Sequence, residues 1–134
     1  MSVRAQTPKV LTLRDAFETE FARREAERRA REDAERRQQE QDLASAEALL
    51  AAVSADRGFL EERGLIADLR RYTVSLDHTN YRVAAYFEAG KVNITLSDKR
   101  TTSPGSAAPR KQETVETVED ALKVMAQFLA DETR

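Results

Sequence analysis

Residues 12–55 contain neither proline nor glycine, and this uninterrupted stretch constrains the fold more than any other feature of the chain. Its middle, residues 23–42, consists largely of charged side chains and alanine, most of which have high intrinsic helix propensity. Thr12 can cap the first turn, with Asp15 three residues further on to complete a capping box. The stretch therefore predicts a single helix roughly 65 Å long.

Acidic side chains precede arginines by four positions along this predicted helix, and each such pair stabilises an isolated helix by about 0.2–0.5 kcal/mol. The pairs are Glu20–Arg24, Glu25–Arg29, Glu27–Arg31, Glu32–Arg36 and Asp33–Arg37. They favour a solvated charged rod that buries no wide apolar stripe. The alternative is a coiled coil along an alanine seam, although a spacing of four departs from a strict heptad. The seam consists of Ala22, Ala26, Ala30 and Ala34.

Large apolar residues return with helical spacing at the end of the stretch, which we expect to pack on a globular head. This face consists of Leu43, Ala46, Leu49, Leu50 and Val53. Asp56-Arg57-Gly58 is predicted to end the helix, with Gly58 at the C′ position. A short helix from Phe59 to about Leu69, bent or interrupted near Gly64, is expected to follow.

The hydrophobic period then changes to two, which is typical of strands. Residues 72–77, 81–88 and 91–97 alternate apolar and polar side chains and predict an antiparallel meander with one apolar face. Residues 98–112 contain Pro104-Gly105 and predict a long mobile loop, after which residues 113–116 can add a fourth strand. Thr117 is expected to cap a final helix, with Asp120 three residues further on.

These elements predict an α+β fold: a long charged N-terminal helix, followed by a small antiparallel sheet of three or four strands covered on one face by helices. The predicted organisation is a flexible tail at 1–11, a helical stalk at 12–42 and a head at 43–134. No segment approaches 18 apolar residues, and the first residues lack the apolar run of a signal peptide. We therefore expect a cytoplasmic protein with no membrane partner.

Few residues offer catalytic chemistry. The chain has no cysteine, which excludes disulfides and thiol catalysis, and His78 is its single histidine, placed in a predicted turn. The acidic pairs Glu61-Glu62 and Glu119-Asp120 lie on predicted helices, so the members of each pair point to different faces. The sequence predicts no enzyme, no cofactor and no metal, although an enzyme or small-ligand binder formed at a dimer cleft is an alternative.

Charge is uneven along the chain: residues 70–111 are rich in basic side chains, whereas residues 112–134 are acidic. This asymmetry indicates either an acidic partner for the basic segment or two segments that face each other. A patch with one aromatic ring could bind a single-stranded nucleic acid, which is the second functional hypothesis. The candidate patch for an anionic partner consists of Arg82, Tyr86, Lys91, Lys99, Arg100, Arg110 and Lys111.

The leading functional hypothesis comes from an apolar cluster at the start of the helix, where Leu13, Phe17 and Phe21 are spaced by four. If the helix is straight, roughly 33 Å separate Phe21 from Leu43, so the cluster cannot reach the core of its own chain. We expect a homodimer, most simply antiparallel, that presents its head to another protein. The candidate contacts are Leu13, Phe17, Phe21, Leu43, Leu49 and Leu50. A frayed helix end, or a bend near residues 38–42, would remove this argument.

Overall fold

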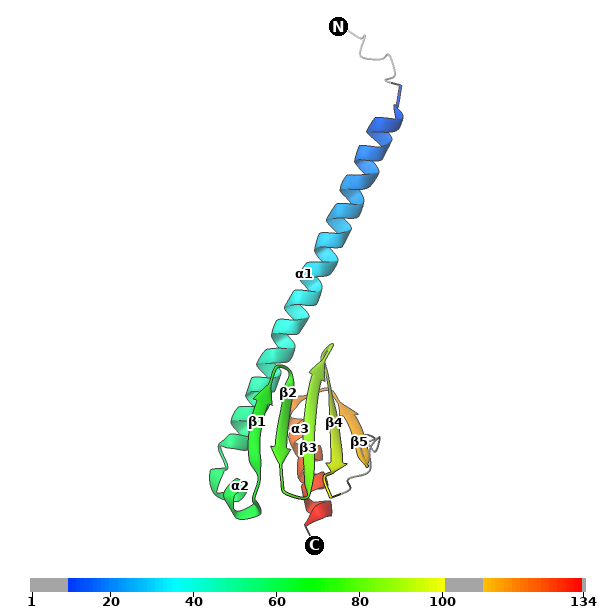
Figure 1. Cartoon of the computed structure of the whole chain (residues 1–134). Coiled ribbons are helices and arrows are strands. Elements are labelled where there is room, and N and C mark those ends of the chain that lie inside the picture. Colours follow the sequence, from blue (N-terminus) through cyan, green and yellow to red (C-terminus); the bar gives the residue numbers. More distant parts are fainter. Residues whose placement is uncertain (1–9, 101–109, 134) are drawn as a thin grey trace. The chain divides into compact units, whose positions relative to one another are not determined.

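The computed structural model describes residues 10–100 and 110–133 and divides the chain into two units, Met1–Arg36 and Arg37–Arg134. The predicted tail and the predicted mobile loop fall largely on residues 1–9 and 101–109, outside the described residues. The chain forms an α+β fold (Figure 1). Its elements are α1 (Leu13–Ser54), α2 (Arg57–Arg63), β1 (Ile66–Arg70), β2 (Thr73–Asp77), β3 (Tyr81–Glu88), β4 (Lys91–Asp98), β5 (Lys111–Val115) and α3 (Val118–Glu132).

The predicted start of the long helix is confirmed, because the Asp15 backbone N–H donates to Thr12 Oγ1 at 3.1 Å. The ion pairs along the helix differ from the predicted set. Glu20–Arg24 forms at 2.8 Å, but Arg23 bridges Glu20 and Glu27. Arg28 likewise bridges Glu25 and Glu32, since the fork of a guanidinium can reach one carboxylate on each neighbouring turn.

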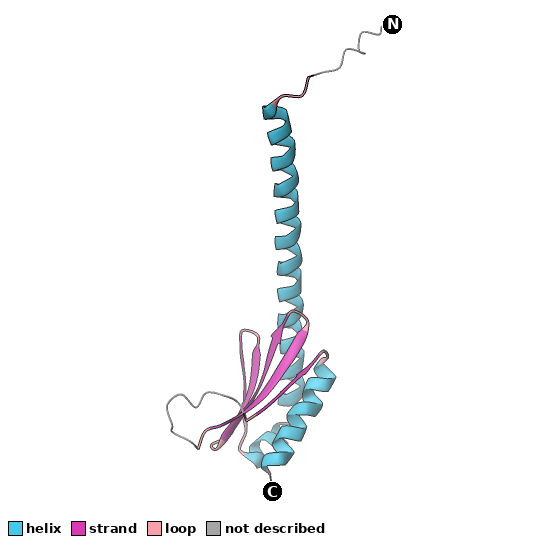
Figure 2. Ribbon diagram, turned by 90° about the vertical axis from the view of Figure 1, so that its right-hand side faces the viewer, coloured by secondary structure: helices cyan, strands magenta, loops and turns pink. Residues whose placement is uncertain are grey.

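The five strands form one antiparallel meander in the order β1-β2-β3-β4-β5, as the alternating sequence pattern predicts for its central part. Ala85 lies opposite Ile94, and Val83 lies opposite Leu96, so that both inner rows face the same side. The last turns of α1 and the whole of α3 cover this side (Figure 2). The predicted fourth strand is β5, and β1 is an additional strand.

Two local predictions around α2 are wrong. Gly58 does not end α1; it lies inside α2, and the left-handed cap is Gly64, with φ of 68°. Here the Leu65 N–H donates to Leu60 O and the Gly64 N–H donates to Glu61 O, which is a Schellman motif. The predicted helix therefore ends at Arg63, and residues 66–70 form β1 because they pair with β2.

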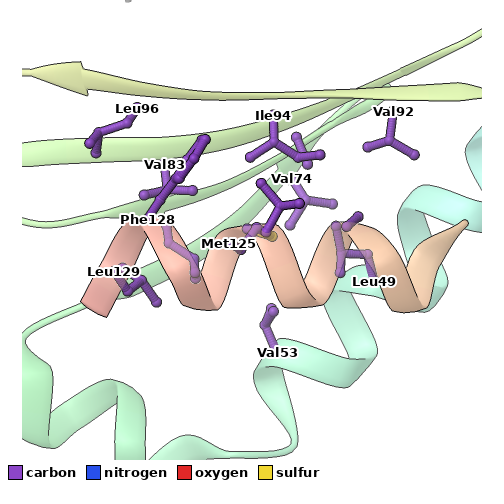
Figure 3. Packing of buried hydrophobic residues seen from close by; sticks show 14 of the residues in the cluster. Leu49, Val53, Val74, Val83, Val92, Ile94, Leu96, Met125, Phe128 and Leu129 are labelled. Atoms are coloured by element: carbon purple, nitrogen blue, oxygen red, sulfur yellow. The ribbon is translucent and has the colours of Figure 1, made fainter. Parts of the chain in front are cut away.

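The core lies between the sheet and the two helices. Figure 3 shows Val92, Ile94 and Leu96 of β4 directed toward α3, with Leu49 and Val53 contributed by α1. Thr117 caps α3 as predicted, because its Oγ1 accepts the Asp120 N–H at 3.0 Å.

A buried carboxylate connects α1 to the β3–β4 turn. Asp42 is only 6% exposed, and its two oxygens accept the backbone N–H groups of Ala89 and Gly90 at 2.9 and 3.0 Å. Gln38 donates a further hydrogen bond to the same carboxylate. Both turn residues have positive φ, 53° and 79°, so the tight turn presents adjacent N–H groups to one side chain. The second unit thus includes residues before 43, the predicted start of the head.

Candidate interaction site

The first unit exposes an apolar stripe on the opening turns of α1. Leu13 is 86% exposed, Phe17 62% and Phe21 53%, and the two phenyl rings stack with centroids 5.8 Å apart. Because Leu13, Phe17 and Phe21 follow one another at every fourth position, they lie on one face of the helix. We call these three residues the N-terminal stripe. Contiguous exposed apolar residues of this kind mark interaction sites more often than isolated ones do.

Charged side chains border the N-terminal stripe. Arg14 and Glu18 follow Leu13 and Phe17 by one position each, so both lie on the same side of the stripe. Glu20 lies on the other side, where hydrogen bonds from Arg23 and Arg24 lower its pKa to about 2. Glu20 is therefore fully ionised at neutral pH, and the stripe is an apolar band between charged margins.

The second unit contains an apolar groove of about 500 Å³. The end of α1, the short helix α2 and one face of α3 form its walls. The side chains that define it are Val53, Phe59, Leu60, Leu122, Met125 and Leu129. Met125 is buried in the floor, whereas Phe59 and Leu122 at the rim each remain 38% exposed. Binding pockets typically have volumes of about 300–1,000 Å³ and mainly apolar walls, and this groove has both properties.

Polar side chains also line the groove. The Arg63 guanidinium carbon lies 6.0 Å from the centroid of the Phe59 ring, and Asp56 also lines the groove. Tyr81 forms part of the floor, where burial and the nearby Glu132 carboxylate raise its pKa. The Tyr81 phenol therefore stays neutral at physiological pH and acts only as a hydrogen-bonding group.

The single histidine packs against Tyr81. The ring of His78 stacks on Tyr81 with centroids 4.5 Å apart, and its Nδ1 accepts the Asn80 N–H at 3.0 Å. Both contacts hold the β2–β3 turn, as the sequence position of His78 indicates. Within residues 10–100 and 110–133, no three His, Asp or Glu side chains converge as a metal site requires.

The structure brings together only part of the predicted anionic-partner patch: Arg82 and Lys99 both contact Asp77, whereas Arg100 and Arg110 both contact Asp98 and Glu132. Arg82 lies opposite Ser97 at one end of the β3–β4 hairpin, and Lys91 lies opposite Glu88 at the other end. Tyr86, 41% exposed, lies between them, and the Glu88 carboxylate raises its pKa. Tyr86 and Lys91 therefore lie nearer the β3–β4 turn than Arg82 does.

The remaining basic residues of that patch pair with carboxylates of their own chain. Lys99 contacts Asp77 at 3.1 Å, and Arg100 contacts Asp98 at 3.0 Å, which lowers the pKa of Asp98. Arg110 pairs with Glu132 and Lys111 with Asp131, both at the end of α3. The basic segment therefore faces the acidic C-terminal segment, which is the second explanation that the charge asymmetry allows.

The predicted dimer contacts on the later part of α1 are only partly available. Leu49 is completely buried in the core of its own chain and cannot contact a partner. Leu50 is half-buried against the same core, and Leu43 is 37% exposed. The apolar groove was not predicted from the sequence, because nothing in the local pattern indicates that α2 lies beside Leu122 of α3.

Comparisons with models of protein families, with curated proteins and with solved structures found no match for this chain. None of the helices in the described part of the chain is both long enough and apolar enough to cross a membrane. The N-terminal stripe, the apolar groove and the charges around them are therefore the features that bear on function.

Proposed function

We propose that this chain is a non-enzymatic interaction protein that homodimerises through the N-terminal stripe and presents its α+β unit to a second protein. The exposure of Leu13, Phe17 and Phe21 carries the proposal. Burying a leucine or phenylalanine side chain is worth about 1.5–3 kcal/mol, so three adjacent ones in water favour association. The two stacked rings already form one continuous apolar surface that a partner can cover.

A second copy is the simplest partner. Most homo-oligomers are two-fold dimers, in which the same surface serves both chains. The core of the second unit is filled by its own residues, including Leu49, Ile94 and Met125. The sequence between Phe21 and Leu43 is also expected to stay helical over roughly 33 Å, which favours contact with another molecule.

The chemistry of the site supports an interaction role. The chain lacks cysteine, and the Nδ1 of its only histidine is engaged by a backbone N–H. The groove walls are apolar, and the Tyr81 phenol in its floor is held neutral. These groups suit packing and hydrogen bonding to a protein surface.

The test is the double substitution Phe17→Asp with Phe21→Asp. Two carboxylates in the stripe would have to be buried at high cost in any apolar contact, so we expect a monomer with an unchanged circular dichroism signature of the α+β unit. Size-exclusion chromatography with light scattering measures the mass. A double variant that keeps the mass of a dimer contradicts the proposal.

The matched control places the same two charges on the opposite face of α1, as Thr19→Asp with Ala26→Asp. Both positions are exposed and lie far from the stripe around the helix. We expect this control to remain dimeric. Its dissociation would instead indicate pairing along the alanine seam.

A further inference from the structure

We infer that the apolar groove of one copy binds the N-terminal stripe of a second copy. This inference rests on the proposed function, since it names the surface that covers the stripe. Two such contacts, related by a two-fold axis, would engage both stripes and both grooves and leave neither apolar surface in water.

The stripe and the groove match in form. Leu13, Phe17 and Phe21 project from three successive turns, a row roughly 12 Å long. The groove lies between helices, with Met125 in its floor and the partly exposed Phe59 and Leu122 at its rim. An amphipathic helix that inserts residues spaced by about one turn into such a groove is a common mode of recognition.

Charge complementarity favours this occupant. Arg14 and Glu18 lie on one side of the stripe, a base and an acid one turn apart. Asp56 and Arg63, an acid and a base, line the groove at the two ends of α2. In the part of the chain that the structure describes, none of these four side chains forms an ion pair, so each is available to an opposite charge on a partner.

The area involved reaches the lower limit of a specific interface. A phenylalanine covers about 150–250 Å² when fully enclosed, and more than half of the Phe17 and Phe21 surfaces is exposed. With Leu13 and the groove surface that they would hide, two contacts remove on the order of 1,000 Å² from water, about the smallest area of a specific interface, which predicts a reversible dimer.

The first test fills the groove without touching the core. Ala126 lies on the exposed side of α3 and lines the groove, so Ala126→Arg places a long charged side chain where the stripe would lie. We expect the dissociation constant of the dimer, measured by sedimentation, to rise at least about 100-fold. The control is Gln127→Arg, which adds the same side chain one position away on the same helix, outside the groove lining.

Equal dimer affinity of the Ala126→Arg and Gln127→Arg proteins would overturn the inference. The proposed function fails separately: if the Phe17→Asp with Phe21→Asp protein stays dimeric, the stripe is not the contact at all. If that protein is monomeric while Ala126→Arg remains dimeric, the stripe mediates dimerisation but occupies another surface.

A second test uses the absence of cysteine from the natural chain. Full-length protein carrying only Phe17→Cys is mixed with protein carrying only Ala126→Cys and is oxidised with diamide. We expect a disulfide-linked pair containing one chain of each kind, in excess over links between identical chains. A chain that carries both substitutions and closes on itself as a linked monomer would overturn the inference, because the stripe would then occupy its own groove.

Discussion

The two parts of α1 show how differently one helix can be stabilised along its length. In residues 13–36, the large apolar side chains are exposed and arginines bridge glutamates on adjacent turns. In the later part, Asp42, Ala46, Leu49 and Val53 are all buried against the sheet and α3. The first part depends on intrinsic propensity and ion pairs, whereas the second depends on packing.

This difference between the two parts of α1 indicates which residues are available to a partner. Each exposed ion pair contributes only about 0–1 kcal/mol of stability. The first part of α1 therefore has few strong stabilising contacts beyond those of the helix itself. Its apolar residues have no core to complete, and they are therefore available to another molecule. The later part uses most of its apolar residues for its own fold, and the groove beside α2 leaves further apolar surface uncovered.

The largest expected effect is on the free energy of unfolding, and it comes from a substitution in the packed part of α1. Leu49→Ala should lower the free energy of unfolding by about 2–5 kcal/mol, because it leaves a cavity in the core. Urea unfolding followed by circular dichroism measures it, in the Phe17→Asp with Phe21→Asp background so that self-association does not contribute. Leu43→Ala is the control: it removes the same atoms from a side chain that is 37% exposed and should cost less than half as much. Equal losses of unfolding free energy in the two variants would contradict the difference between the buried and the exposed leucine.

Asp42→Ala should have the next largest effect, about 3 kcal/mol, since it removes charge-assisted hydrogen bonds and leaves the Ala89 and Gly90 N–H groups without their acceptor. Amide hydrogen exchange should show lost protection at these two residues. Glu40→Ala, an exposed acid on the same helix, should change stability by less than about 0.5 kcal/mol. If both variants unfold at the same urea concentration, the carboxylate does not hold the turn.

The smallest effect concerns the ion pairs of the first part. Because the folded-state pKa of Glu20 is lowered from 4.5 to about 2, its contribution to helix stability is complete above pH 4.5 and is lost as the pH falls through about 2. The ellipticity difference between the natural chain and Glu20→Gln should therefore be constant above pH 4.5 and disappear near pH 2. A difference that persists unchanged at pH 2 would show that the Glu20 charge is not its source.

Much of the fold follows from local sequence. The start of α1, the caps at Thr12 and Thr117, and the alternation in β2, β3 and β4 each depend on neighbouring residues, and the structure confirms them. Strand β1 could not be predicted in this way. Its five residues carry two charges and a small alanine, and only pairing with β2 makes them a strand.

The two surfaces of the candidate site also differ in whether local sequence predicts them. The N-terminal stripe is visible from the spacing of three residues, whereas the groove requires Phe59 and Leu122, from two separate helices, to be placed beside each other. The ion pairs of the predicted basic patch could not be foreseen for a related reason. Arg110 and Lys111 pair with acids of α3 that lie far away in sequence.

The central claim is that the exposed stripe drives self-association, and the mass of the natural chain in solution tests it most directly. Light scattering on the eluted peak, with the protein at tens of micromolar, should give twice the 15.1 kDa of one chain. Dilution should then shift the mass toward a single chain, as a reversible dimer requires. A mass of 15.1 kDa at every concentration would contradict the account.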